Sequence, residues 1–160
     1  MMRFVLFIFS VFILLSCTKE SKVVYQIQDV YLTQSGADKP NVKNSKAYIS
    51  IAYQDIFENT IPTAQLDDLS KMYISFGDVK VVEDLIIRNF LNKSNAKIPS
   101  NDQMRADIPA FVNNSYKRFF NRLPNDQELW YFTNSIEKNA EITTETIFLA
   151  LLTSNEYRNF

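Results

Sequence analysis

The stretch 108–120, IPAFVNNSYKRFF, decides the fold class of this chain. Its proline is the second residue, a place in the first turn of a helix where the missing N–H costs no hydrogen bond. The large apolar residues then recur at helical spacing and share one face. The side chains expected on this buried face are Phe111, Tyr116, Phe119 and Phe120. Because the whole chain has only two glycines for tight hairpins, the pattern predicts an all-α fold.

A second helix is expected directly after the first, which should stop near Leu123-Pro124. Asn125, with Glu128 three residues later, matches a capping box, in which each side chain accepts a hydrogen bond from the backbone N–H of the other residue. The helix that starts there should continue to about Lys138.

A further helix should begin after Thr143, which is a suitable N-cap. Its apolar face would consist of Ile147, Phe148, Leu151 and Leu152. Ser154 can then cap a last helical turn.

The upstream stretch 47–100 contains a similar series of elements. We expect a first helix over 47–59, a second that Thr63 caps and Gly77 ends, and a third that Asp78 caps. The apolar stripe of the third helix should be Val79, Val82, Leu85, Ile86 and Phe90. The polar residues that follow end this unit.

The two halves match at an offset of about 63 residues, which predicts an internal duplication. The matching positions are Ala47-Tyr48 with Ala110-Phe111, Tyr53 with Tyr116, Phe57 with Phe120 and, one residue out of register, Pro62 with Pro124. Convergence of two amphipathic three-helix stretches is the alternative. We therefore expect about six helices in two related units, 47–100 and 101–160, which together can form one domain.

The N-terminal run Leu14-Leu15-Ser16-Cys17 resembles the lipobox of bacterial lipoproteins, whose cysteine is lipidated and becomes the mature N-terminus. Arg3 precedes an apolar stretch of roughly 12 residues, whereas about 20 are needed to span a bilayer. A signal peptide cut elsewhere would leave Cys17 as an odd cysteine in an oxidising compartment. We therefore predict a signal peptide over 1–16 and a lipidated, flexible tether over 17–46.

The resemblance to lipoproteins also implies a location. In the best-known sorting rule, an aspartate after the cysteine retains the protein in the inner membrane, so Thr18 favours the outer membrane. Lys19-Glu20 is similar to the charged export tags of surface lipoproteins in Bacteroidota. These residues are compatible with either the periplasmic or the surface face of the membrane.

The amino-acid composition excludes several types of catalytic, metal and cofactor site. The chain has no histidine, and its one cysteine is the proposed lipid anchor at Cys17, so the usual catalytic triads, imidazole zinc sites, disulfides and iron–sulfur clusters are excluded. No glycine-rich phosphate loop is present. The net charge of −1 gives no basic patch for nucleic acid. We expect no cofactor, no metal and no nucleic-acid partner.

The C-terminal unit carries the pattern Tyr116-x-x-Phe119-Phe120-x-Arg122-x-Pro124, then Glu128-Leu129-Trp130 and finally Ser154-x-Glu156-Tyr157. It resembles a bacterial helical module of unknown function, and phycobilisome linker polypeptides have a similar ending. The resemblance implies structural roles, with Arg122 bonded to the last carbonyls of its helix or paired with an acid such as Glu156, and Tyr157 packed on the core. The alternative is that Arg122 and Glu156 mark a binding groove. The first unit has Asn59 in place of Arg122.

The three consecutive aromatics 130–132 cannot all be buried on one helix face, so one should be partly exposed, and Trp130 is a candidate contact for a sugar or a protein. Three sets of acidic residues are candidates for acid–base pairs, namely Asp67-Asp68, Glu83-Asp84 and Glu137 with Glu141. We expect a non-catalytic interaction or structural subunit of an envelope assembly, with an envelope protein as partner. The alternatives are a carboxylate-dependent glycan hydrolase and a small glycan- or peptide-binding lipoprotein.

Overall fold

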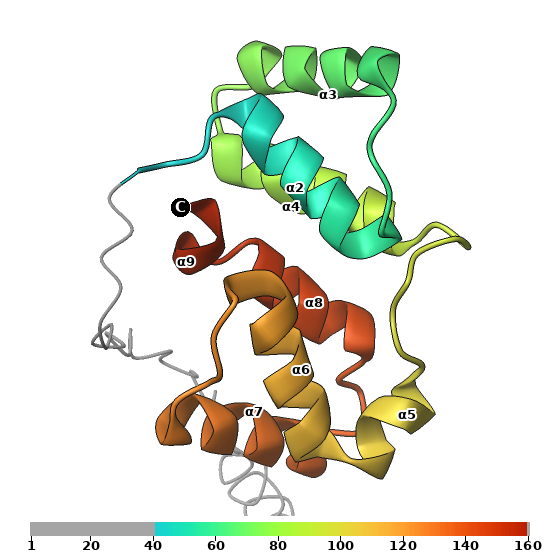
Figure 1. Cartoon of the computed structure of the whole chain (residues 1–160), viewed down its shortest axis with the longest axis vertical. Helices are drawn as coiled ribbons and strands as arrows, with labels where there is room; N and C mark the ends of the chain where they lie inside the picture. The colour runs from blue at the N-terminus through green and yellow to red at the C-terminus, as the bar shows by residue number, and fades with distance from the viewer. Residues whose placement is uncertain (1–40, 160) are drawn as a thin grey trace, which may run out of the picture. The chain divides into compact units, whose positions relative to one another are not determined.

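The computed structural model describes residues 41–159, which contain eight helices and no strand (Figure 1). The predicted all-α class is therefore confirmed for this part of the chain. One isolated antiparallel bridge joins Val42 to Asn159. The predicted signal peptide 1–16, the lipidation site Cys17 and the tether up to residue 40 lie outside the described residues. Within residues 41–159 no helix combines the length and hydrophobicity needed to cross a bilayer.

The first unit contains the three predicted helices, α2 (Ser45–Phe57), α3 (Thr63–Ser75) and α4 (Val79–Leu91). Asp78 caps α4 as predicted, because its carboxylate accepts hydrogen bonds from the next turn. The predicted cap at Thr63 is wrong. Pro62 occupies the N-cap position in an extended conformation, so Thr63 is already the first helical residue and its hydroxyl caps nothing.

The second unit contains α5 (Asn101–Ala106), α6 (Ile108–Phe120), α7 (Asp126–Lys138), α8 (Thr144–Leu152) and α9 (Asn155–Arg158). The predicted caps at Asn125, Thr143 and Ser154 are all present. The sequence analysis missed α5, which is too short to display a helical period. Its signal was a capping box, in which Ser100 and Gln103 bond each other's backbone N–H.

The helices of the structure repeat at the same offset of 63 residues that the sequence shows. α2 and α6 each have 13 residues, and both end at a residue in the left-handed conformation, Glu58 with φ 55° and Asn121 with φ 56°. α3 and α7 also have 13 residues each and begin at equivalent positions. The match ends in the third pair, because α8 has 9 residues where α4 has 13.

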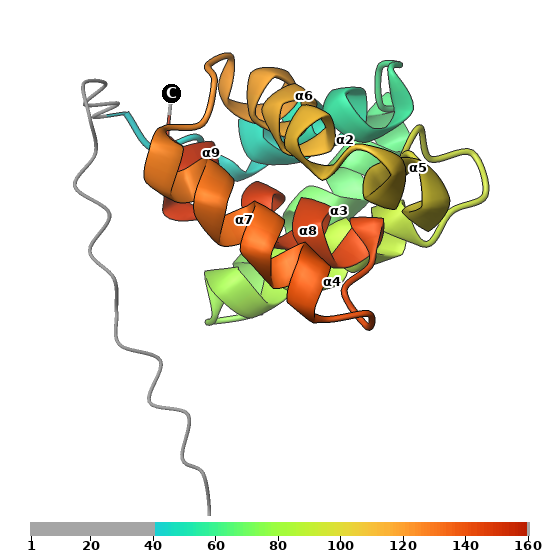
Figure 2. The ribbon, with the colours of Figure 1, turned by 90° about the horizontal axis from the view of Figure 1, so that it is seen from below.

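The two units share one hydrophobic core. α4 packs against α8, and α9 lies beside α6 and α8 (Figures 1 and 2). Arg118 on α6 donates to the backbone oxygen of Asp55 on α2, the residue 63 positions earlier. The largest completely buried side chains are Tyr48, Phe90, Phe148 and Tyr157. Figure 1 shows α9 between the helices of the first unit and those of the second.

The apolar stripe predicted for α4 is wrong at Leu85, which is 47% exposed. The buried face of this helix includes Val82, Ile86 and Phe90, as expected, but also Glu83 and Leu91. At 100° per residue this face is centred on the side of Phe90 and Glu83, which leaves Leu85 on the opposite side. The predicted stripe is displaced from the buried face because Glu83 was expected among the surface acids and is buried instead.

Candidate functional site

Arg122 forms an ion cluster with Glu128 and Glu156. Its Nη2 lies 2.7 Å from Glu128 Oε1, and its Nε lies 2.7 Å from Glu156 Oε1. The guanidinium also lies over the ring of Tyr116, 5.1 Å from the centroid. Five hydrogen bonds use all of its N–H donors, the last of them to the backbone oxygen of Leu123. The expected pair of Arg122 with Glu156 is thus present, and no donor of Arg122 is left for a ligand.

Glu128 is the buried member of this Arg122 cluster, with 6% of its surface exposed. Burial raises the pKa of the carboxyl, but the bonds from Arg122 and from the Asn125 N–H outweigh burial and hold the pKa below its usual value. The two carboxylates raise the pKa of the Arg122 guanidinium. The cluster is therefore a stable set of charges that fixes the α6–α7 corner to α9.

α9 connects the second unit to the first. Tyr157, which is buried as predicted, donates from its hydroxyl to Asp55 Oδ2 on α2 at 2.6 Å. Arg158 Nε lies 3.1 Å from Glu83 Oε1 on α4. The ammonium of Lys43 donates to the backbone oxygen of Tyr157. Together with the Arg122 cluster, these contacts give Glu156, Tyr157 and Arg158 a structural role.

Glu83 is the most deeply buried carboxylate of the described residues, with 2% of its surface exposed. Tyr73 donates to it at 2.7 Å, in addition to the ion pair with Arg158. Burial raises the pKa of Glu83, although both contacts act in the opposite direction. Burial likewise raises the pKa of Asp55. Sequence analysis missed the Tyr73–Glu83 contact, whose only signal was the position of Glu83 on the true buried face of α4.

The other candidate carboxylates of the first unit pair with cations at the surface. Asp67 lies 2.7 Å from Lys46, and Asp68 lies 3.0 Å from Lys71. The neighbour of Glu83, Asp84, lies 2.6 Å from Arg88. The structure thus directs each of these acids to a separate basic partner. Among residues 41–159 no group of three or more His, Cys, Asp or Glu side chains is arranged to hold a metal ion.

A polar hollow of about 420 Å³ lies where the two units meet. It is lined by Gln54, Asp55, Glu58 and Arg118. Arg118 already donates to the backbone oxygens of Asp55 and Lys97. The hollow therefore surrounds an internal contact.

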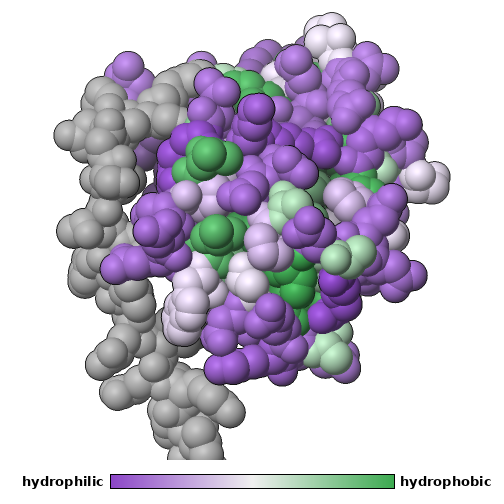
Figure 3. Space-filling model, turned by 60° about the horizontal axis from the view of Figure 1, so that its bottom comes forward, coloured by the Kyte–Doolittle hydropathy of each residue, from purple (hydrophilic) through white to green (hydrophobic). Residues whose placement is uncertain are grey.

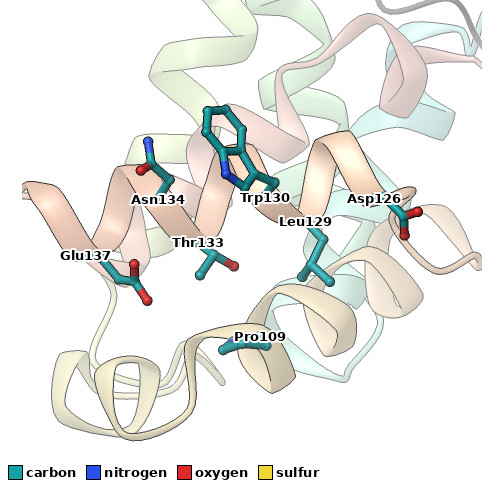
Figure 4. A pocket seen from close by; sticks show the side chains of 7 residues that line it. All are labelled: Pro109, Asp126, Leu129, Trp130, Thr133, Asn134 and Glu137. Carbon is teal, nitrogen blue, oxygen red and sulfur yellow. The ribbon is translucent and has the colours of Figure 1, made fainter.

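A second hollow, of about 340 Å³, lies along α7, and we call it the Trp130 groove (Figure 4). It is lined by Pro109, Asp126, Leu129, Trp130, Thr133, Asn134 and Glu137. In Figure 4, Leu129 and Thr133 point from α7 toward Pro109 on α6, while the ring of Trp130 and Asn134 lie on the other side of the α7 ribbon. The side chains of Asp126 and Glu137 lie toward opposite ends of the groove.

The aromatic run on α7 is more exposed than predicted. Trp130 is 65% exposed and Tyr131 is 60% exposed, whereas one exposed ring was expected. Only Phe132 turns inward, where its ring lies 5.9 Å from that of Tyr116. The face of the molecule in Figure 3 is mostly hydrophilic, with apolar side chains in separate patches. The indole of Trp130 has a large apolar ring and a polar N–H, a combination that is enriched at protein interfaces, so Trp130 is a candidate contact residue.

Three polar groups of the Trp130 groove have no partner among residues 41–159. Among the residues that the structure describes, neither Asp126 nor Glu137 forms an ion pair. Thr133 has a buried hydroxyl oxygen without a hydrogen-bond partner. The candidate site therefore combines an exposed aromatic ring with unpaired polar groups, in contrast to the saturated Arg122 cluster.

No protein-family model, curated protein or solved structure matches the chain. The likeness of its C-terminal residues to phycobilisome linkers, and of its N-terminal residues to lipoproteins, stays a prediction from the sequence.

Proposed function

We propose that this protein is a non-catalytic, lipid-anchored subunit of a bacterial envelope assembly and that it contacts its partner through the Trp130 groove. The observation that carries the proposal is the exposure of Trp130, at 65%, beside a groove whose polar groups are unpaired. Tryptophan and tyrosine are enriched among the residues that dominate binding energy at protein interfaces.

The contrast between two candidate surfaces supports this assignment. Arg122, Glu156 and Tyr157 use their polar groups in contacts inside the domain, so they have little to offer a partner. Trp130 and Tyr131 on α7 expose most of their ring surface. A partner that covered α7 would bury this aromatic surface and meet the unpaired acids of the groove.

The anchor is the second part of the proposal. Cys17 would carry the lipid, and Thr18 favours the outer membrane. A lipidated chain needs a spacer between the membrane and its folded domain, and the segment that precedes α2 provides one. The proposed role is thus to hold the Trp130 groove near the membrane, where a partner of the same envelope assembly binds it.

Affinity purification of the tagged protein from detergent-solubilised envelopes tests the proposal. We expect a stoichiometric envelope partner with the natural chain, a loss of that partner with Trp130→Ala, and a reduction with the unanchored Cys17→Ser chain. The matched control is Ile74→Ala, which removes a side chain that is 87% exposed at the end of α3. This variant should retain the partner.

Two further readouts separate binding from folding and anchoring. The melting temperature of Trp130→Ala should stay close to that of the natural chain, because the removed ring is largely exposed. Metabolic labelling with a radioactive fatty acid should mark the natural chain and leave Cys17→Ser unlabelled. Recovery of the protein alone from every sample, or equal capture by the natural and Trp130→Ala chains, would contradict the proposed function.

A further inference from the structure

We infer that the Trp130 groove binds an extended, positively charged peptide segment, in which lysine or arginine side chains meet Asp126 and Glu137. The inference rests on the proposed function and specifies the chemistry of the partner. It is carried by the charge of the groove, the position of the indole and the spacing of the two acids.

The charge of the groove is of one sign. Asp126 and Glu137 contribute two carboxylates, and none of the seven lining residues is basic. Some other acids among residues 41–159 have a basic partner, such as Asp67 beside Lys46, and others, such as Glu141 and Glu145, have none. The two acids of the groove form no ion pair among the described residues, so a cationic segment would supply the opposite charge that the domain does not.

The indole of Trp130 lies between these two acids in the sequence of α7. A lysine or arginine side chain over an indole gains a cation–π interaction, and tryptophan is the best of the aromatic residues for it. A neutral sugar would also stack on the ring, but it would leave both carboxylates without an opposite charge. The combination therefore favours a basic peptide over a glycan.

The spacing along α7 sets the length of the segment. Asp126 and Glu137 are 11 residues apart, which corresponds to about 16 Å along a helix axis. An extended peptide covers this distance in about five residues. We expect basic side chains at both ends of such a stretch, with its backbone beside Thr133. The unpartnered hydroxyl of Thr133 would find a main-chain partner there after rotation of its side chain.

The chain contains its own reporter, because Trp130 is its only tryptophan. We would titrate the full chain in detergent with hexa-arginine and follow the tryptophan fluorescence. The neutral comparison is hexa-citrulline, which has nearly the same shape without the charge. We expect a saturable change with hexa-arginine that weakens as the salt concentration rises, and little change with hexa-citrulline.

Two double variants with the same change of charge test whether the carboxylates of the Trp130 groove bind hexa-arginine. Asp126→Asn with Glu137→Gln should weaken the binding of hexa-arginine by about tenfold or more, since it removes both carboxylates of the groove. Asp68→Asn with Asp84→Asn makes the same change of charge on α3 and α4 and should leave the affinity unchanged. Calorimetric titration of Trp130→Leu should show a weaker affinity as well.

Three results would overturn the inference: equal binding of hexa-citrulline, equal loss of affinity in both double variants, or a response to chitotetraose without one to hexa-arginine. The last result would assign the groove to a glycan. These outcomes are separate from failure of the proposed function, because loss of a stoichiometric envelope partner in Trp130→Ala would still support an interaction subunit whose partner is not basic.

Discussion

The two units of the domain have the same helical frame but opposite ionic chemistry. In the first unit, burial raises the pKa of both Asp55 and Glu83. In the second unit, the pKa of the buried Glu128 is lowered. The first two pairs of equivalent helices keep their length of 13 residues in spite of this difference, whereas α8 is shorter than α4. Apolar spacing and helix ends, which the two units share, therefore account for the matching helices, whereas the charged contacts differ between the units.

The difference follows from the number of donors that each carboxylate meets. Glu128 accepts from two nitrogens of Arg122, at 2.7 and 2.8 Å, and from the Asn125 N–H at 2.8 Å. Glu83 accepts from the Tyr73 hydroxyl and lies 3.1 Å from one nitrogen of Arg158. A buried carboxylate with several charge-assisted hydrogen bonds is held ionised, whereas one with fewer bonds remains dominated by burial.

The largest expected effect is that of Arg122→Ala. The substitution leaves Glu128 buried without a counter-charge and detaches Glu156, so the free energy of unfolding should fall by about 3 kcal/mol. Urea denaturation measures this change. Arg88→Ala, which removes an exposed pair within α4, should lower the free energy of unfolding far less, because solvent screens that pair. Similar costs for both substitutions would contradict the special role of the second unit's cluster.

The buried carboxylates of the two units should affect the pH dependence of the free energy of unfolding in opposite directions. The lowered pKa of Glu128 means that its contribution is present above the unfolded value, about 4.3, and is lost as the pH falls through the folded value. The raised pKa of Glu83 has the opposite sign: its contribution is present below the unfolded value and is lost as the pH rises through the folded one.

Urea denaturation at a series of pH values tests both signs. Glu128→Gln should flatten the loss of stability that accompanies a fall in pH below the unfolded value, and Glu83→Gln should flatten the loss that accompanies a rise in pH above it. Each group changes the slope by at most about 1.4 kcal/mol per pH unit. Flattening on the same side in both variants would show that the two carboxylates do not differ as described.

A smaller effect on the free energy of unfolding is expected from substitutions at the N-terminal ends of the equivalent helices α3 and α7. Asn125→Ala removes the capping box of α7 and should lower the free energy of unfolding by about 1 kcal/mol. Thr63→Ala at the start of α3 should change it by less than about 0.5 kcal/mol, because the Thr63 hydroxyl caps nothing. Thermal denaturation of the two variants gives the comparison, and a larger effect at Thr63 would contradict it.

The smallest expected effect concerns the cation that covers the equivalent phenylalanine in each unit. Arg122 lies over Phe120, whereas Lys93 lies 6.0 Å from the ring centroid of Phe57. Lys93→Gln should reduce stability by about 0.5 kcal/mol. Lys117→Gln, at an exposed position of α6, is the control and should have a smaller effect. A loss at Lys93 as large as that at Arg122 would remove the distinction between the units.

Much of the fold could be predicted because its signals are local. Helical spacing and the caps at Asp78, Asn125 and Thr143 locate most of the helices. The failures have local causes as well. Pro62, and not Thr63, occupies the N-cap position of α3. α5 is too short for its apolar residues to show a helical period.

The site could be predicted only in part. The pair of Arg122 with Glu156 was expected from a resemblance, and the exposed aromatics from the geometry of a helix. The Trp130 groove could not be predicted, because Pro109 joins it from another helix and contact across helices leaves no pattern in the sequence. The same holds for the contact between Tyr73 and Glu83, which depends on how α3 turns toward α4.

The contact of Arg118 with Asp55, residues at equivalent positions in the repeat, has a geometric consequence. Residues of two identical subunits meet their own counterparts only near a two-fold axis, as in an isologous dimer. The packing of α4 against its counterpart α8 has the same form. These two contacts thus have the form of contacts in an isologous dimer, and the segment 92–100 joins the two halves. Their association is intramolecular, so dilution, which dissociates a true dimer, leaves this pseudo-dimer intact.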